Sequence, residues 1–163
     1  LGHQRIACMT GPAQSSSSTQ RVEGYVQALE EAGIVVDPVL IVAGDFRIQG
    51  GDLAMQQLLK LDTPPTAVFA CNDLMAIGVI QAVRHHGLKV PDDISVVGFD
   101  DIPLAQAIYP ALTIIAQPML EIANVAMDML VKQIQGKAVH SREQIILQPK
   151  LMYRDSSKAV KRL

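Results

Sequence analysis

The chain has 163 residues, 49% of them hydrophobic, with a formal net charge of -2 and a pI near 6.1. This length suits one domain with a sizeable apolar core. The first 130 residues hold no basic run, which argues against a direct nucleic-acid surface. No stretch reaches the roughly 18–20 apolar residues that a membrane helix requires, and the first residues do not resemble a signal peptide.

Two cysteines, Cys8 and Cys71, each lie in a short apolar run typical of a strand. Such small thiols are usually buried and unpaired, which favours a reducing, cytoplasmic setting. The chain also lacks an initiator methionine, so we expect it to be cut from a longer protein.

The first half of the chain alternates predicted strands and helices. Residues 4–10 form an apolar strand, and a polar serine loop leads into a helix that ends at Gly33. A second strand over residues 39–42 and a helix over residues 49–60 follow. This is the opening of an α/β unit.

A third strand over residues 67–71 leads directly into Asn72, which is well placed to cap the next helix. That helix runs to about His86, and residues 74–80 are apolar on every side. A helix that covers one face of a sheet needs only an apolar stripe. We therefore predict that a partner subunit buries its outer face.

Two further strands, over residues 94–99 and 112–116, precede a helix over residues 119–134. A last strand-like run over residues 145–153 contains Pro149, which favours an edge position. A polar tail follows, and we expect it to be frayed. The alternation predicts an α/β fold with a doubly wound parallel sheet.

Polar side chains collect where the predicted strands end. Parallel sheets bind ligands outside the carboxyl ends of their strands, so we expect these residues to share one crevice. Amides, carboxylates, a guanidinium and an aromatic face suit a neutral polyol such as a sugar. The residues are Ser15, Ser17 and Arg21, then Asp45 and Phe46, Asn72 and Asp73, Asp100 and Asp101, and Gln117.

Each of these residues also has a purely structural interpretation. Asn72 with Asp73, and separately Asp101, are candidate helix caps, and Arg21 is a candidate solvated charge. Phe46 and Gln117 suit loop packing and a turn. Asp100 is the hardest to dismiss, because a carboxylate directly behind a buried strand needs a pocket or a partner.

Catalytic alternatives are weaker. Asp73, Asp100 and Asp101 could form a magnesium cluster, but the sequence has no Gly-rich phosphate loop. It has no GxSxG motif, and the adjacent His85 and His86 would point in different directions on a helix. We therefore predict no enzyme, no catalytic residues, no metal and no cofactor, and keep an acidic magnesium enzyme as a third alternative.

Several segments together resemble the effector-binding core of the LacI/GalR family of bacterial transcription regulators. They include GHQRIACMTGP, RVEGYVQALEEAGI, GDF, PTAVFACNDLMAIGV, VPDDISVVGFDDIPLAQAIYPALTII, QP and LQPKLMYRDSS, and the match covers nearly the whole chain. The resemblance implies a periplasmic-binding-protein-like type I fold, of which this chain is mainly the carboxyl-proximal lobe.

The resemblance also implies a set of effector contacts and a dimer surface. The effector residues are Arg21, Phe46, Asn72, Asp100 and Gln117, with Ser17 less regularly, and Asn72 favours a sugar over a purine. The dimer surface falls on residues 74–83 and 102–109, with Leu74, Ile77, Gly78, Gln81, Leu104 and Ile108 as candidates.

We expect residues 1–117 to form the lobe, residues 118–154 to pack with a second lobe that is missing here, and residues 155–163 to be a flexible tail. The function implied is sensing of a pentose or hexose, with homodimerisation, in a cytoplasmic repressor. Its operator would be bound through an N-terminal helix-turn-helix outside this chain. The alternative is a secreted periplasmic sugar-binding transport receptor.

Overall fold

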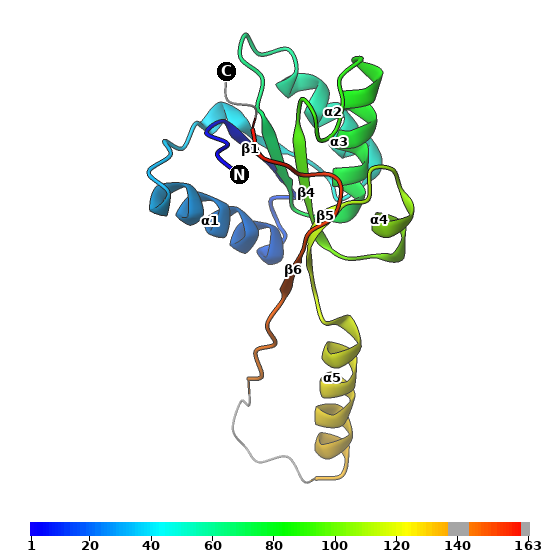
Figure 1. Cartoon of the computed structure of the whole chain (residues 1–163). Coiled ribbons are helices and arrows are strands. Elements are labelled where there is room, and N and C mark those ends of the chain that lie inside the picture. Colours follow the sequence, from blue (N-terminus) through cyan, green and yellow to red (C-terminus); the bar gives the residue numbers. More distant parts are fainter. Residues whose placement is uncertain (137–143, 161–163) are drawn as a thin grey trace.

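A single six-stranded sheet organises the computed structural model, which describes residues 1–136 and 144–160 (Figure 1). The spatial order is β2-β1-β3-β4-β5-β6, and β1 to β5 run parallel while β6 is antiparallel to β5. The strands are β1 Ile6–Thr10, β2 Ile41–Ala43, β3 Ala67–Ala70, β4 Ser95–Asp100, β5 Thr113–Ala116 and β6 Lys150–Met152.

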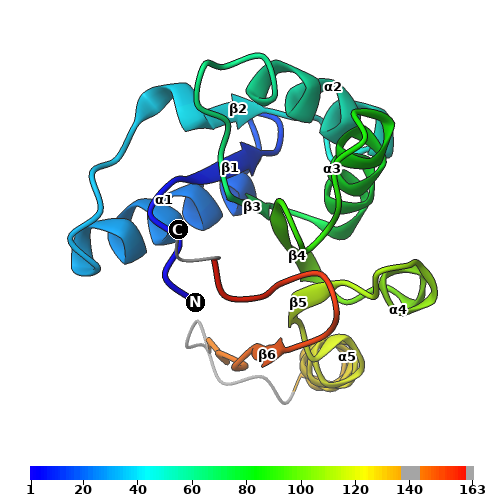
Figure 2. The same ribbon diagram turned by 45° about the horizontal axis from the view of Figure 1, so that its top comes forward.

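Helices lie on both faces of this sheet, so the doubly wound α/β prediction is confirmed. Figure 2 shows α1 on one face, with α2 and α3 together on the other. A short 3-10 turn, Pro38–Leu40, leads into β2. The helices are α1 Ser16–Glu31, α2 Ile48–Leu58, α3 Asp73–His85, α4 Pro103–Ala107 and α5 Met119–Ile134.

The order of the strands places β3 and β4 at the centre of the sheet, with β1 beside β3, and β1 and β3 are largely buried. Cys8 pairs with Ile41 of β2 and with Phe69 of β3, so the three strands are in close register. Since all five parallel strands point the same way, the loops that follow them lie along one edge. This edge carries the candidate site.

Residues 75–80 of α3 are all buried by their own chain, so the argument that their all-round apolarity requires a partner subunit is wrong. Helix α2 packs against them. A Cβ added at Gly78 would lie 2.0 Å from the carbonyl oxygen of Ile48, and one added at Gly51 would lie 2.2 Å from that of Met75. Two glycines thus let the helices touch backbone to backbone, and Ile77 and Gly78 are buried inside the lobe.

The tail begins as an ordered part of the lobe, so the expectation of flexibility from residue 155 is wrong for its first residues. Ser156 is fully buried. Its hydroxyl donates to the carbonyl oxygen of Val96 at 2.6 Å and accepts from the N–H of Thr113 at 2.7 Å. The side chain therefore bridges β4 and β5. Residues 161–163 lie outside the described part of the chain.

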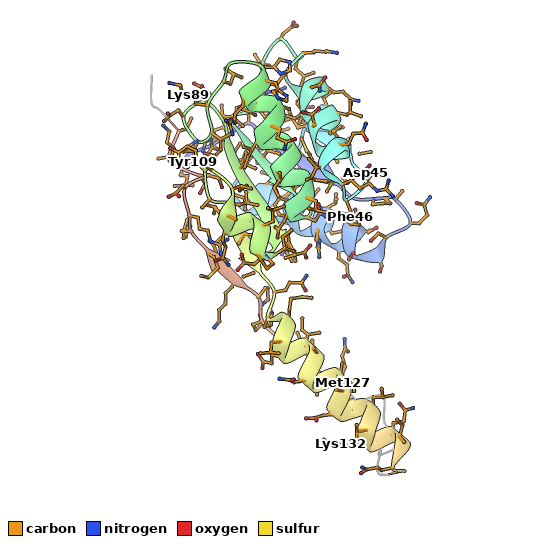
Figure 3. All side chains as sticks on the ribbon, turned by 90° about the vertical axis from the view of Figure 1, so that its right-hand side faces the viewer. Asp45, Phe46, Lys89, Tyr109, Met127 and Lys132 are labelled. Carbon is orange, nitrogen blue, oxygen red and sulfur yellow. The ribbon has the colours of Figure 1, made fainter. Side chains whose placement is uncertain are left out.

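Helix α5 projects away from the sheet, as Figures 1 and 3 both show. None of its residues is buried, although much of its surface is apolar. Strand β6 forms the edge of the sheet, as Pro149 predicted, but it spans three residues of the expected run. In the described residues, no helix combines the length and apolarity needed to cross a membrane.

Candidate ligand-binding site

Asp100, the last residue of β4, is the centre of a polar cluster at the carboxyl edge of the sheet. Its Oδ1 accepts a hydrogen bond from Nη2 of Arg21 at 3.1 Å and one from Nε2 of Gln117 at 2.7 Å. Both bonds converge on one oxygen. In the described part of the chain, Oδ2 is left as an acceptor for a ligand.

The sheet register explains why Gln117 reaches Asp100. Asp100 pairs with Ala116 across the β4–β5 ladder, so Gln117 follows directly at the same level. The backbone N–H of Gln117 also donates to the Asp100 carbonyl oxygen at 3.3 Å. Two residues 17 positions apart are thus fixed side by side by strand pairing.

Arg21 extends from α1 across the end of the sheet. Its Nη1 donates to the carbonyl oxygen of Cys71, and the guanidinium carbon lies 3.9 Å from the centre of the Phe99 ring. An arginine held by a carboxylate, a carbonyl and an aromatic face has little freedom to move. The interpretation of Arg21 as a solvated helix charge is therefore wrong.

Asn72 links the start of α3 to the loop between β2 and α2. Its Oδ1 accepts from the N–H of Met75 at 3.0 Å, so the predicted capping of α3 is confirmed. Its Nδ2 donates to the carbonyl oxygen of Phe46 at 3.0 Å. An amide can donate two hydrogen bonds, so a second donor remains for a ligand.

Phe46 lies in the loop between β2 and α2, next to Asp45 (Figure 3). Its backbone is in the left-handed region, with φ 63°. The ring packs against Gly11, where an added Cβ would lie 2.0 Å from Cζ. The Asp45 carboxylate accepts from the N–H of Arg47 at 2.8 Å and so stabilises the turn.

Ser17 lies at the start of α1, close to this cluster. Its hydroxyl is 2.9 Å from that of Ser15, the residue that caps the helix. Ser17, Arg21 and Gln117 also line a cavity of about 740 Å³ between α1 and the sheet. The rest of its lining is largely apolar and includes Tyr25, so this cavity suits packing better than sugar hydroxyls.

Sequence reasoning missed the roles of two acids. Asp101 forms an ion pair with Nη2 of Arg154 at 2.8 Å rather than capping α4. Asp73 is 1% exposed, and its Oδ2 accepts from the N–H of Ile102 at 2.8 Å. Burial, together with the nearby charges of Asp100 and Asp101, raises the pKa of Asp73 to about 6, although hydrogen bonds from two backbone N–H groups oppose the shift.

Neither the thiols nor the acids of the described residues form a second site. Cys8 and Cys71 are buried and unpaired, and their mutual hydrogen bond, followed by burial, raises the pKa of the Cys8 thiol. Within residues 1–136 and 144–160, no group of three or more His, Cys, Asp or Glu is arranged to hold a metal ion.

The structure brings the predicted residues into one connected set. The contacts run from the Phe46 carbonyl to Asn72, then through Cys71 and Arg21 to Asp100. Gln117 closes the set at Asp100, and Ser17 lies beside Arg21. The arrangement offers charged and neutral hydrogen-bonding groups on one rim.

This lobe, with its polar rim at the carboxyl ends of a parallel sheet, has the fold of the periplasmic binding protein-like class. The family model for the periplasmic binding protein-like domain matches residues 1–157, and the chain belongs to that family.

Its similarity to LacI/GalR-type regulators is confirmed by individual proteins. The chain is 47% identical over 159 residues to the HTH-type transcriptional repressor CytR of Escherichia coli (strain K12), covering 98% of the chain and 46% of CytR. It is 44% identical over 156 residues to the ribose operon repressor of the same strain, and this match covers 96% of the chain and 47% of the ribose operon repressor. The chain therefore spans about half the length of these curated relatives.

Solved structures agree. A CelR–cellobiose complex superposes with a TM-score of 0.91 and 35% identity, covering 96% of this chain and 47% of that one. The lac repressor dimer bound to operator and the anti-inducer ONPF superposes with a TM-score of 0.89 and 34% identity, and the match covers 98% of this chain and 54% of that one. These named relatives are transcriptional regulators rather than enzymes.

Proposed function

We propose that this chain is the effector-sensing lobe of a LacI/GalR-type transcriptional repressor whose DNA binding is controlled by a small sugar. The observation that carries the proposal is the convergence of Arg21 and Gln117 on one oxygen of Asp100. Asn72 is connected to them because Arg21 also donates to the carbonyl oxygen of Cys71, the residue directly before Asn72. Relatives that include a ribose operon repressor and a cellobiose complex support a carbohydrate effector.

The cluster suits neighbouring hydroxyl groups. In this proposal Oδ2 of Asp100 accepts from one or two hydroxyls, while Arg21 and the free N–H of Asn72 donate to hydroxyl oxygens. The Phe46 ring offers an apolar face to the C–H side of the sugar, and Ser17 and Gln117 contact its edge. No bond in the sugar needs to break, so we propose a sensor rather than an enzyme.

A second lobe would close the site from the opposite side. Helix α5 has no buried residue, yet Leu120 is 76% exposed and Ile134 is 76% exposed. Large exposed apolar surfaces mark interaction sites. We propose that residues 118–149 pack with this second lobe, as the resemblance implies. The expectation that residues 150–154 belong with them is wrong, because β6 pairs with β5 and Arg154 forms an ion pair with Asp101 in the lobe described here.

Closure of the two lobes on a sugar would bias the regulator between states that bind DNA and states that do not. Such coupling requires the sugar to bind the two states with different affinity. We propose that the operator contacts come from an N-terminal helix-turn-helix outside this chain and that the regulator acts in the cytoplasm.

We propose that the regulator is a homodimer, as the relative solved as a lac repressor dimer suggests. The surface would use Leu74, Gln81, Leu104 and Ile108, which are exposed or half-buried, the latter two on and after α4. Ile77 and Gly78 are excluded from this surface, because both are buried inside the lobe. If analytical sedimentation finds that the intact regulator is strictly monomeric at high protein concentration, the proposed homodimer is wrong.

A secreted transport receptor shares the fold and the polar set, but the named relatives favour the regulator. Titration calorimetry of the intact regulator with ribose and with cellobiose tests the proposal. We expect one of them to bind, and Asp100→Ala to abolish binding and sugar-induced release of operator DNA. Asp37→Ala is a matched control, because Asp37 pairs with Arg5 at 3.1 Å away from the site. Equal binding by both variants and the unmodified protein would exclude the assigned site.

A further inference from the structure

The loop that presents Asp100 has an unusual backbone. Asp100 and Asp101 both lie in the left-handed region, with φ 115° and φ 70°. Residues other than glycine hold such conformations only when their surroundings over-determine them. Something must therefore fix this loop between β4 and α4.

Asp73 provides one of the anchors. It lies in the first turn of α3, and its buried Oδ2 accepts from the N–H of Ile102, directly after the two left-handed residues. Its Oδ1 has no hydrogen-bond partner within the described residues. A buried carboxylate is costly unless it serves a fixed partner, and here the partner is the loop backbone.

The neighbouring strand leaves room for this carboxylate. A Cβ added at Gly98 would lie 2.9 Å from Oδ1 of Asp73 and 2.7 Å from Cδ2 of Leu112. The carboxylate therefore lies against β4 two residues before Asp100. A second anchor, the ion pair between Arg154 and Asp101, holds the loop from the β6 side.

We propose that Asp73 is a positioning residue of the effector site. Its carboxylate fixes the backbone of the β4–α4 loop, and the fixed loop turns the Asp100 side chain toward Arg21 and Gln117, where the sugar binds. This inference rests on the proposed function and deepens it. Asp73 itself does not contact the sugar.

Two substitutions of Asp73 separate positioning from general stability. Asn keeps an acceptor for the Ile102 N–H, whereas Ala removes it. In the intact regulator we expect Asp73→Ala to weaken binding of ribose or cellobiose about tenfold or more, the usual effect of losing a hydrogen bond to a charged group. We expect Asp73→Asn to restore affinity to within about threefold.

Hydrogen exchange of the peptide that contains Ile102, followed by mass spectrometry, reads the loop directly. We expect faster exchange in Asp73→Ala than in the unmodified regulator, and near-normal exchange in Asp73→Asn. Asp52→Ala is the matched control, because Asp52 lies on α2 and bonds to Gln56 at 2.6 Å, away from this loop. Should Asp73→Ala fail to fold, Asp73→Ser carries the same test, since its shorter side chain does not extend to the Ile102 N–H.

The outcomes separate this inference from the proposed function. If the unmodified regulator binds neither sugar, the proposed function fails and this inference fails with it. If sugar binds normally and the Ala or Ser variant exchanges normally at Ile102, this inference alone is overturned. Faster exchange with unchanged affinity also overturns it, because the loop would then not position Asp100.

Discussion

Replacing Gly78 by alanine tests the packing that buries α3. A Cβ at this position would lie 2.0 Å from the Ile48 carbonyl oxygen and 2.6 Å from the Asp52 nitrogen. Both are backbone atoms of α2, so no side-chain rotation can relieve the overlap. The two helices must separate or bend.

The expected loss of stability follows from two opposing effects. Alanine is favoured over glycine inside a helix by about 1 kcal/mol. Overpacking a well-packed core costs about 1–3 kcal/mol, and a rigid overlap this short belongs at or above the upper end. We expect a net loss of about 2 kcal/mol, which lowers the Tm of a chain of this size by about 4–8 °C.

Thermal unfolding followed by circular dichroism measures this change in the chain itself. Gly24→Ala is the matched control, because Gly24 lies inside α1 and an added Cβ there meets nothing within 4 Å. The control should raise the Tm. If Gly78→Ala raises the Tm by as much as the control does, then α2 does not cover this face of α3 and the fold description is wrong.

Three further predictions concern the site. Arg21→Ala should weaken sugar binding at least about tenfold, since hydrogen bonds to charged groups contribute about 1.5–3 kcal/mol, whereas Arg5→Ala should not change it in calorimetry. Gly11→Ala should also weaken binding, because an added Cβ would overlap the Phe46 ring at 2.0 Å; normal affinity would exclude a role for that ring. Because the pKa of Asp73 is raised, the folded state binds the proton of this carboxyl more tightly than the unfolded state does. Protonation of Asp73 therefore stabilises the folded state at low pH, and this contribution to the free energy of unfolding declines as pH rises from about 4 to about 6. Asp73→Asn should therefore flatten this part of the pH profile in urea titrations, and an unchanged slope would contradict the shift.

Hydrophobic periodicity and turn residues predicted the strands and helices well, because each apolar run is bounded by glycine, proline or a capping residue. Asn72 illustrates this, since its place before an apolar helix identified it as a cap. The same local logic failed for α3. An apolar run without a polar face indicates that residues 75–80 are buried but does not show which element covers them, and the close approach of Gly51 to Met75 follows from tertiary packing.

The grouping of the candidate site residues was predictable because parallel strands bring their carboxyl ends together. The buried hydrogen bonds of Asp73 and Ser156 were not. Both are polar residues buried by long-range partners, Ile102 for Asp73 and Val96 for Ser156. An interpretation from neighbouring residues alone assigns such residues to a helix cap or to a frayed tail. The left-handed conformation of Asp100 and Asp101 is likewise a property of the folded loop.

The central claim is that the carboxyl ends of the sheet form one sugar-binding rim. A crystal structure of the intact regulator with the bound sugar tests it most directly. The account predicts sugar hydroxyls within hydrogen-bond distance of Asp100, Arg21 and Asn72. A sugar bound instead in the apolar cavity under α1, without contact to Asp100, would contradict it.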